Sequence, residues 1–167
     1  MTRTEAKARL VAWRVSARQM HAISRRIAIL RRRKEEAATI RSSLAFEEVA
    51  VTENGPELAA LPHGTTTGDP TARAAIKCIE IQDEMDELQR QLDQYSRYYF
   101  DVLKATVEQL PYQDFMVLHS YYCIADSSAM PGVDSKSFFR KLRDATTMFQ
   151  TVFGLPQIPK MIEAIKK

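Results

Sequence analysis

Residues 69–110, DPTARAAIKCIEIQDEMDELQRQLDQYSRYYFDVLKATVEQL, decide the fold. Asp69 suits an N-cap, because its short side chain accepts hydrogen bonds from free backbone N–H groups, and Pro70 suits the first helical position. Neither Gly nor Pro follows until Pro111. The sequence therefore predicts one uninterrupted helix over residues 70–110.

Apolar side chains recur in this stretch at alternating intervals of four and three residues, which is the heptad pattern of a coiled coil. The pattern runs through Ala74, Cys78, Ile81, Met85, Leu88, Leu92, Tyr95, Tyr99 and Val102. Such a helix would be roughly 60 Å long at ~1.5 Å per residue, which is too long for one small compact core. We therefore expect the positions from Cys78 to Tyr99 to form a seam that a second helix covers, from the same chain or from another copy.

A second long helix is predicted over residues 3–50, which also lack Gly and Pro. Its apolar stripe consists of Trp13, Met20 and Ile27, with Ile23, Leu30, Ala37 and Leu44 on the neighbouring register. A connector over residues 51–69 is rich in Gly, Pro and Thr and joins the two helices. We expect an all-α fold in which residues 1–110 form a long antiparallel helical hairpin, or coiled coil.

Charge is distributed unevenly along the chain. Residues 1–50 carry twelve Lys and Arg against five Asp and Glu, residues 51–110 five against eleven, and residues 111–167 seven against five. Opposite charges on the two long helices favour their pairing. The arginine run, residues 31–34, wraps around its helix rather than lining one face, because successive residues turn by about 100°. Given the opposite charge of the second helix, we interpret the run as partner-facing charge in preference to a direct nucleic-acid contact. Pairing between copies remains the alternative.

The C-terminal third predicts a small helical unit, residues 111–154, followed by a tail, residues 155–167, with a short helix after Pro159. A first short helix is expected over residues 111–124, and the last substantial helix is expected to begin near Ser135 and to end at Gly154. One face of that last helix is apolar, and it consists of Phe138, Leu142, Ala145, Phe149 and Val152. The opposite face is cationic and carries Lys136, Arg140, Arg143 and Thr147. Half of the helix is suited to burial and half to an anionic partner.

This arrangement resembles the phage-encoded transcriptional regulators that carry a helix-turn-helix similar to region four of sigma factors. The likeness is carried by a few short matches: Gly68-Asp69-Pro70-Thr71, Leu110, Val117-Leu118, Tyr121-Tyr122, Phe139-Arg140 and Ala145. In that family a full helix follows the tyrosine before the turn, whereas here Ser127-Ser128-Ala129-Met130 leaves about one helical turn too few before Pro131-Gly132. Either the first helix of a degenerate helix-turn-helix is trimmed, or the C-terminal unit serves another use. The resemblance implies a DNA-binding C-terminal unit whose contact residues are Lys136, Ser137, Arg140, Arg143 and Thr147.

No constellation of residues indicates catalysis or a cofactor. The sequence has no Gly-rich phosphate loop, no GxSxG and no HExxH, and its three histidines lack metal-ligand spacing. Cys78 and Cys123 belong to no CxxC pair, which favours free thiols in a reducing compartment. The charged N-terminus and the lack of a long apolar run indicate a cytoplasmic protein that does not enter a membrane. We expect a protein that is not an enzyme.

Two functions remain open from the sequence. The first is a DNA-binding transcriptional regulator of a phage or mobile element, in which the coiled-coil stalk dimerises or docks on transcription machinery. The alternative is a helical assembly or adaptor protein that binds a protein partner through its coiled coil. The resemblance and the cationic helix face favour the first.

Overall fold

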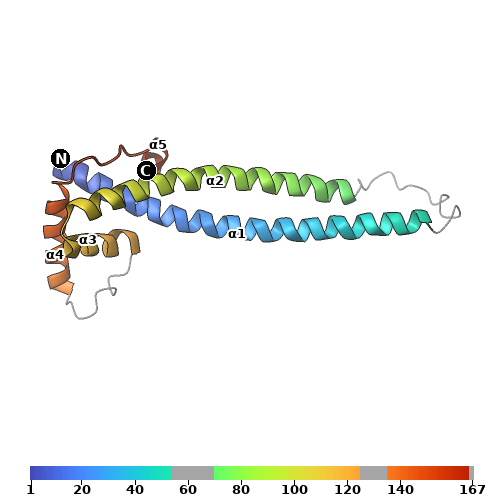
Figure 1. Cartoon of the computed structure of the whole chain (residues 1–167), viewed down its shortest axis with the longest axis horizontal. Coiled ribbons are helices and arrows are strands. Elements are labelled where there is room, and N and C mark those ends of the chain that lie inside the picture. Colours follow the sequence, from blue (N-terminus) through green and yellow to red (C-terminus); the bar gives the residue numbers. More distant parts are fainter. Residues whose placement is uncertain (54–69, 125–134, 166–167) are drawn as a thin grey trace. The chain divides into compact units, whose positions relative to one another are not determined.

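The computed structural model describes residues 1–53, 70–124 and 135–165, and all regular secondary structure in them is helical. The elements are α1 (Arg3–Glu53), α2 (Pro70–Gln109), α3 (Tyr112–His119), the π-helical turn η2 (Ser120–Ile124), α4 (Ser135–Phe149) and α5 (Lys160–Ala164). The two long helices, α1 and α2, run antiparallel and form a hairpin, and small helices follow it (Figure 1). The predicted all-α hairpin is confirmed, and most of the expected connector lies outside the described residues.

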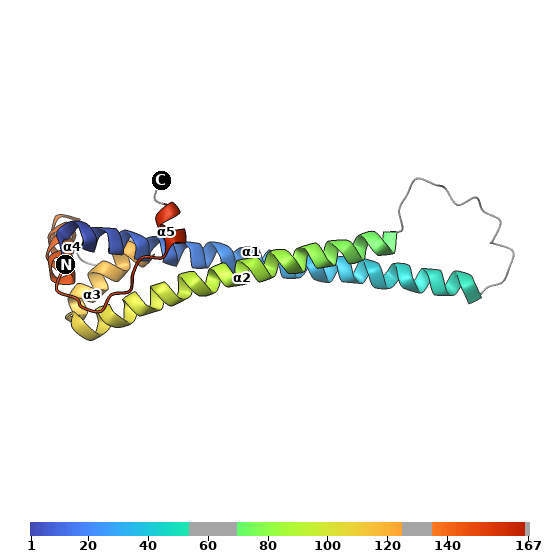
Figure 2. The same ribbon diagram turned by 90° about the horizontal axis from the view of Figure 1, so that it is seen from above.

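The chain divides into two compact units, and both long helices contribute to each. In the unit of residues 24–90, α1 and α2 lie side by side in both views (Figures 1 and 2). Its buried side chains are Ile27, Leu30, Ala37 and Ile81. Arg26 donates to Glu84 at 2.6 Å, and the Lys34 ammonium donates to Gln82 at 2.6 Å. The basic segment of α1 and the acidic segment of α2 therefore pair within the chain.

Burial along α2 follows the heptad pattern. Ile81, Tyr95 and Val102 are buried, and the other pattern positions, Ala74, Cys78, Met85, Leu88, Leu92 and Tyr99, are half-buried. A single neighbouring helix covers only one side of each seam residue, so partial burial is the expected result of two-helix packing. Leu44, on the corresponding stripe of α1, lies outside the described side chains.

The second compact unit joins residues 1–23 to residues 91–167. Its fully buried large apolar side chains are Leu10, Trp13, Val102, Leu118, Phe149 and Ile162. Pro111 has an extended backbone (φ −53°, ψ 140°), which stops the helical path between α2 and α3. Pro159 has a similar conformation directly before α5. Proline thus sets two of the boundaries in this unit.

The tail, residues 150–165, runs from the end of α4 over α1 and α2 of the same unit. Gln109 holds its first part through two hydrogen bonds to the backbone of Phe153, at 2.7 and 2.8 Å. Gly154 then adopts a φ of +71°, a conformation that side chains with a Cβ disfavour. The last predicted helix was expected to end at this glycine, but α4 ends at Phe149, and turn hydrogen bonds carry the chain onward.

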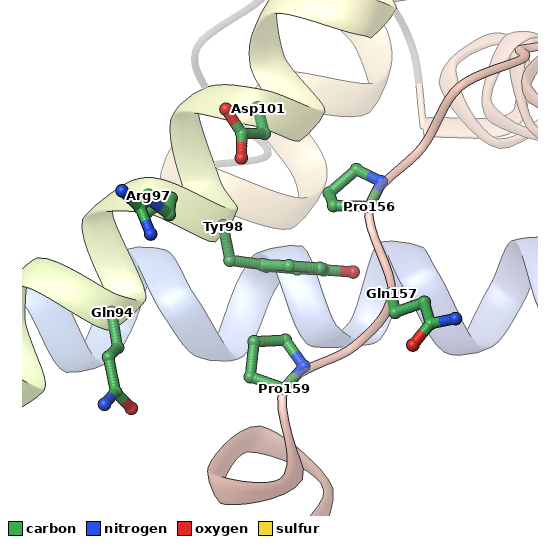
Figure 3. Close-up of a pocket in the computed structure, with 7 residues that line it drawn as sticks. All are labelled: Gln94, Arg97, Tyr98, Asp101, Pro156, Gln157 and Pro159. Carbon is green, nitrogen blue, oxygen red and sulfur yellow. The ribbon is translucent and has the colours of Figure 1, made fainter.

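Tyr98 of α2 anchors the second part of the tail (Figure 3). Its ring lies between the rings of Pro156 and Pro159, and all three residues line a small cavity of about 190 Å³. Arg9 of α1 donates hydrogen bonds to the backbone carbonyls of Leu155 and Pro156. Three segments far apart in sequence therefore meet at one aromatic ring.

Tyr98 yields a stability prediction. Its hydroxyl is buried and has no hydrogen-bond partner among the described residues, so Tyr98→Phe should leave the free energy of unfolding unchanged or raise it by up to ~1 kcal/mol. Tyr98→Ala removes the ring from between two prolines and should cost about 3 kcal/mol. Urea unfolding of the three proteins measures both changes, and a clear loss in Tyr98→Phe would contradict the unpartnered hydroxyl.

Alkaline pH provides a second readout of the same side chain. Burial raises the pKa of the Tyr98 phenol to about 12. The folded protein therefore holds this proton more tightly than the unfolded chain, and stability should fall between about pH 10 and about pH 12. Tyr98→Phe should lose less stability than the wild type across this interval.

Candidate nucleic-acid interface

The packing of α4 against α3 fixes which side of α4 faces solvent. Phe138, Leu142, Ala145 and Phe149 of α4 are all buried, and they recur at intervals of three and four residues. This spacing places them along one side of a helix. The apolar face predicted from the sequence is therefore the one that the unit buries.

The opposite side carries the cationic face, which we define as Lys136, Arg140, Arg143 and Thr147. All four side chains are exposed, and their spacing places them along one line of the helix. The Thr147 hydroxyl donates to the carbonyl of Arg143 at 3.0 Å, so its hydrogen is already used within the helix. Ser137, the fifth predicted contact residue, is half-buried and lies about 100° around the helix from Lys136.

The positive charge of this face is not neutralised locally. Among the described residues, the ion pairs involve α1 and α2 alone, and none includes Lys136, Arg140 or Arg143. Asp144 is the single carboxylate in α4. Unpaired cations along one helix line create a positive potential that favours an anionic partner.

Lys141 lies on a different side of α4. It lines a groove beside α3 together with Tyr112, Gln113, Asp114, Met116 and Val117. This position separates it from the cationic face, although it is the immediate neighbour of Arg140 in sequence. The arrangement around the predicted turn, residues 125–134, lies outside the described residues, so the shortened helix-turn-helix remains a prediction.

The arginine run in the other unit is a weaker candidate for an anion site. Arg31, Arg32 and Arg33 are exposed, and Lys34 is the member of the run that hydrogen-bonds to α2. Arg32 approaches Glu36 of its own helix at 3.8 Å. Carboxylates at positions 80, 83, 84, 86 and 87 of α2 belong to the same unit, and they reduce the attraction of this surface for a polyanion.

An aromatic cluster links α1, α2 and α3 in the unit that carries α4. The Trp13 ring centroid lies 6.1 Å from Tyr99 and 5.7 Å from His119, and the Tyr99 hydroxyl is 2.9 Å from Nε2 of His119. Phe115 stacks on His119 at 5.4 Å. This cluster was not predicted from the sequence. The available signal was the presence of Trp13 on the apolar stripe of α1 and of Tyr99 on that of α2.

The titratable groups near this cluster are suited to packing. Burial lowers the pKa of His119, which favours the neutral ring. Burial also raises the pKa of the Cys123 thiol to about 12, so this sulfur stays protonated and weakly nucleophilic at neutral pH. Cys78 and Cys123 are both free thiols. The cluster therefore positions helices and supplies no activated nucleophile.

The described part of the chain holds neither a candidate metal site nor a candidate membrane span. No group of three or more His, Cys, Asp or Glu side chains there is arranged to hold a metal ion. None of the described helices combines the length and apolar character needed to cross a lipid bilayer. No protein-family model, curated protein or solved structure matches the chain.

His119 yields a prediction for acidic pH. Because burial lowers its pKa, the unfolded chain binds more protons than the folded protein once the pH falls below about 6.5. The contribution of His119 to stability should be complete above this pH and should decline as the pH falls below it. His119→Gln should remove this step from a plot of unfolding free energy against pH.

Tyr99→Phe is the matched control for that experiment. It removes the hydroxyl that contacts His119 but keeps the ring that helps to bury it. Because burial is the cause of the lowered pKa, Tyr99→Phe should keep the step. If His119→Gln retains the full pH dependence, the histidine is not its source.

Proposed function

We propose that the protein is a DNA-binding transcriptional regulator of a phage or mobile element, in which the cationic face of α4 contacts duplex DNA. The observation that supports this most strongly is the exposure of Lys136, Arg140 and Arg143 along one helix line. The buried apolar face of α4 fixes this line relative to α3. A fixed row of unpaired cations is suited to binding the negatively charged phosphates of a duplex.

The dimensions of an isolated helix face also suit this proposal. A helix with its side chains is about 10–12 Å across, and the major groove of B-DNA is about 12 Å wide. Arginine can bind a phosphate or the O6 and N7 atoms of guanine through two parallel hydrogen bonds, whereas lysine acts as a point charge. We therefore assign Arg140 and Arg143 to two-pronged contacts with phosphates or base edges, and Lys136 to a single phosphate contact.

The hairpin supplies the second half of the proposal. The resemblance to phage transcriptional regulators assigns α1 and α2 to a stalk that dimerises or docks on transcription machinery in the cytoplasm. The half-buried seam of α2, which includes Met85 and Leu88, leaves apolar surface that a further helix could cover. Neither role requires a cofactor.

The adaptor function keeps one observation in its favour. Tyr112 and Phe153, in the unit that carries α4, expose 74% and 77% of their surface. Exposed aromatic side chains are enriched at protein interfaces. An adaptor would bind its partner through such residues and through the coiled coil, and it would bind DNA weakly.

A salt titration with nonspecific duplex DNA tests the proposal. Each phosphate contact releases counterions, so the double variant Arg140→Ala, Arg143→Ala should flatten the plot of log K against log salt by roughly 1 to 2 units. Its unfolding free energy should change by less than about 0.5 kcal/mol, because both side chains are exposed and away from the buried face.

Lys104→Ala with Lys160→Ala is the matched control. This variant removes the same charge from exposed positions of the same unit that lie outside α4. We expect it to keep the wild-type salt slope. If the α4 variant stays folded and keeps both affinity and slope, α4 does not contact DNA and the adaptor function is favoured.

A further inference from the structure

Phe139 is an exposed aromatic residue within the row of cations. It exposes 56% of its surface, although its neighbour Phe138 is 5% exposed and part of the core. Residues three and four positions apart are neighbours on a helix surface, so Phe139 lies between Lys136 and Arg143. Arg140 follows it directly in sequence. An apolar ring is thus bracketed by the groups that we assign to DNA contact.

Two other aromatic side chains contact the ring of Phe139. Phe138 meets it edge to face at 5.8 Å between ring centroids, and Tyr121 does so at 6.5 Å. The guanidinium of Arg14 lies 5.6 Å above the Tyr121 ring and adds a cation–π contact to this support. These contacts limit the side-chain rotation of Phe139 and leave its outer part open to solvent.

A protein partner is a poor match for this position. Interfaces that bury an aromatic anchor surround it with further apolar surface, which excludes water. Among the described residues of α4, Met148 is the other exposed large apolar side chain. It lies nine positions from Phe139 and therefore about 180° around the helix. Within α4, the exposed neighbours of Phe139 are therefore the cations Lys136, Arg140 and Arg143 rather than further apolar side chains.

Duplex DNA offers phosphates for the cations and an apolar group for the ring of Phe139. Cations bind the phosphates at the groove edges, and the apolar group that a helix meets inside the major groove is the C5-methyl of thymine. Phenylalanine is one of the side chains that contact this methyl. We propose that Phe139 contacts thymine methyl groups, so that α4 prefers A·T pairs that carry the methyl. This inference rests on the DNA contact proposed above.

Two duplex polymers that differ by that methyl alone test the inference. The probes are alternating poly(dA-dT) and alternating poly(dA-dU), bound to the full-length protein at one salt concentration. Burying one methyl is worth about a fourfold change in affinity, so the wild type should bind the thymine polymer about fourfold more tightly. Phe139→Ala should bind the two polymers equally.

Met148→Ala is the matched control, because it removes an exposed apolar side chain from the opposite side of α4. Met148→Ala should keep the fourfold preference for the thymine polymer. Arg143→Ala should also keep this preference, but it should lower the affinity for both polymers and flatten the salt dependence. A wild type without methyl preference, or a Phe139→Ala variant that keeps it, overturns the inference. The wild-type comparison needs no variant and is unaffected by any folding defect.

The outcomes separate this inference from the proposed function. Suppose that the arginine variants flatten the dependence of log K on log salt, but the wild type does not prefer the thymine polymer. This result would retain α4 as the DNA-binding helix and refute the role of Phe139. Unchanged slopes in those variants would refute the DNA contact itself. Tighter binding to single-stranded poly(dT) than to the duplex, lost in Phe139→Ala, would assign Phe139 to base stacking and overturn the methyl contact.

Discussion

The burial of Trp13 is the interaction on which the unit carrying α4 depends. This side chain of α1 is fully buried and contacts Tyr99 of α2 and His119 of α3, so one indole links its own helix to two others. Its Nε1 has no hydrogen-bond partner among the described residues, a cost that the packing of the large ring must exceed. Because α3 is fixed by these contacts and α4 packs on α3, the orientation of the cationic face follows from Trp13.

The division of α4 into a buried side and a cationic side separates the residues that stabilise the fold from those that we propose to bind DNA. Burial of Phe138 and Phe149 fixes the apolar side of α4 in the core. The exposed cations therefore contribute little to stability, so a change at these positions affects binding more than folding. Arg26 shows the contrast, because it is engaged by Glu84 within the hairpin. A cation that already has a carboxylate partner gains less from a phosphate.

Periodicity carried most of the information about the fold. The heptad pattern of residues 70–110 predicted α2 and its partner, because period and uninterrupted length are local properties of the sequence. Burial of Ile81 and Tyr95 follows from that pattern. The predicted domain boundary at residue 110 does not coincide with the boundary between the two compact units, because residues 1–23 belong to the same unit as residues 91–167. Antiparallel pairing brings the start of α1 to the end of α2, which no local pattern encodes.

The candidate site was predictable to a similar degree. Helical spacing alone places Lys136, Arg140 and Arg143 on one face of a helix. The exposure of Phe139 was not predictable, because the sequence alone favours a buried position for an aromatic residue beside Phe138. The contact of Tyr98 with the tail and the Tyr99–His119 pair were also missed, since both join segments that are distant in sequence.

We propose that α4, and not the arginine run, contacts DNA. Titration of isotopically labelled protein with a short duplex, followed by backbone amide NMR, tests it most directly. We predict that the largest shift changes fall at Lys136, Phe139, Arg140 and Arg143, with small changes at residues 31–34. Changes concentrated at residues 31–34 with α4 unaffected would contradict the account.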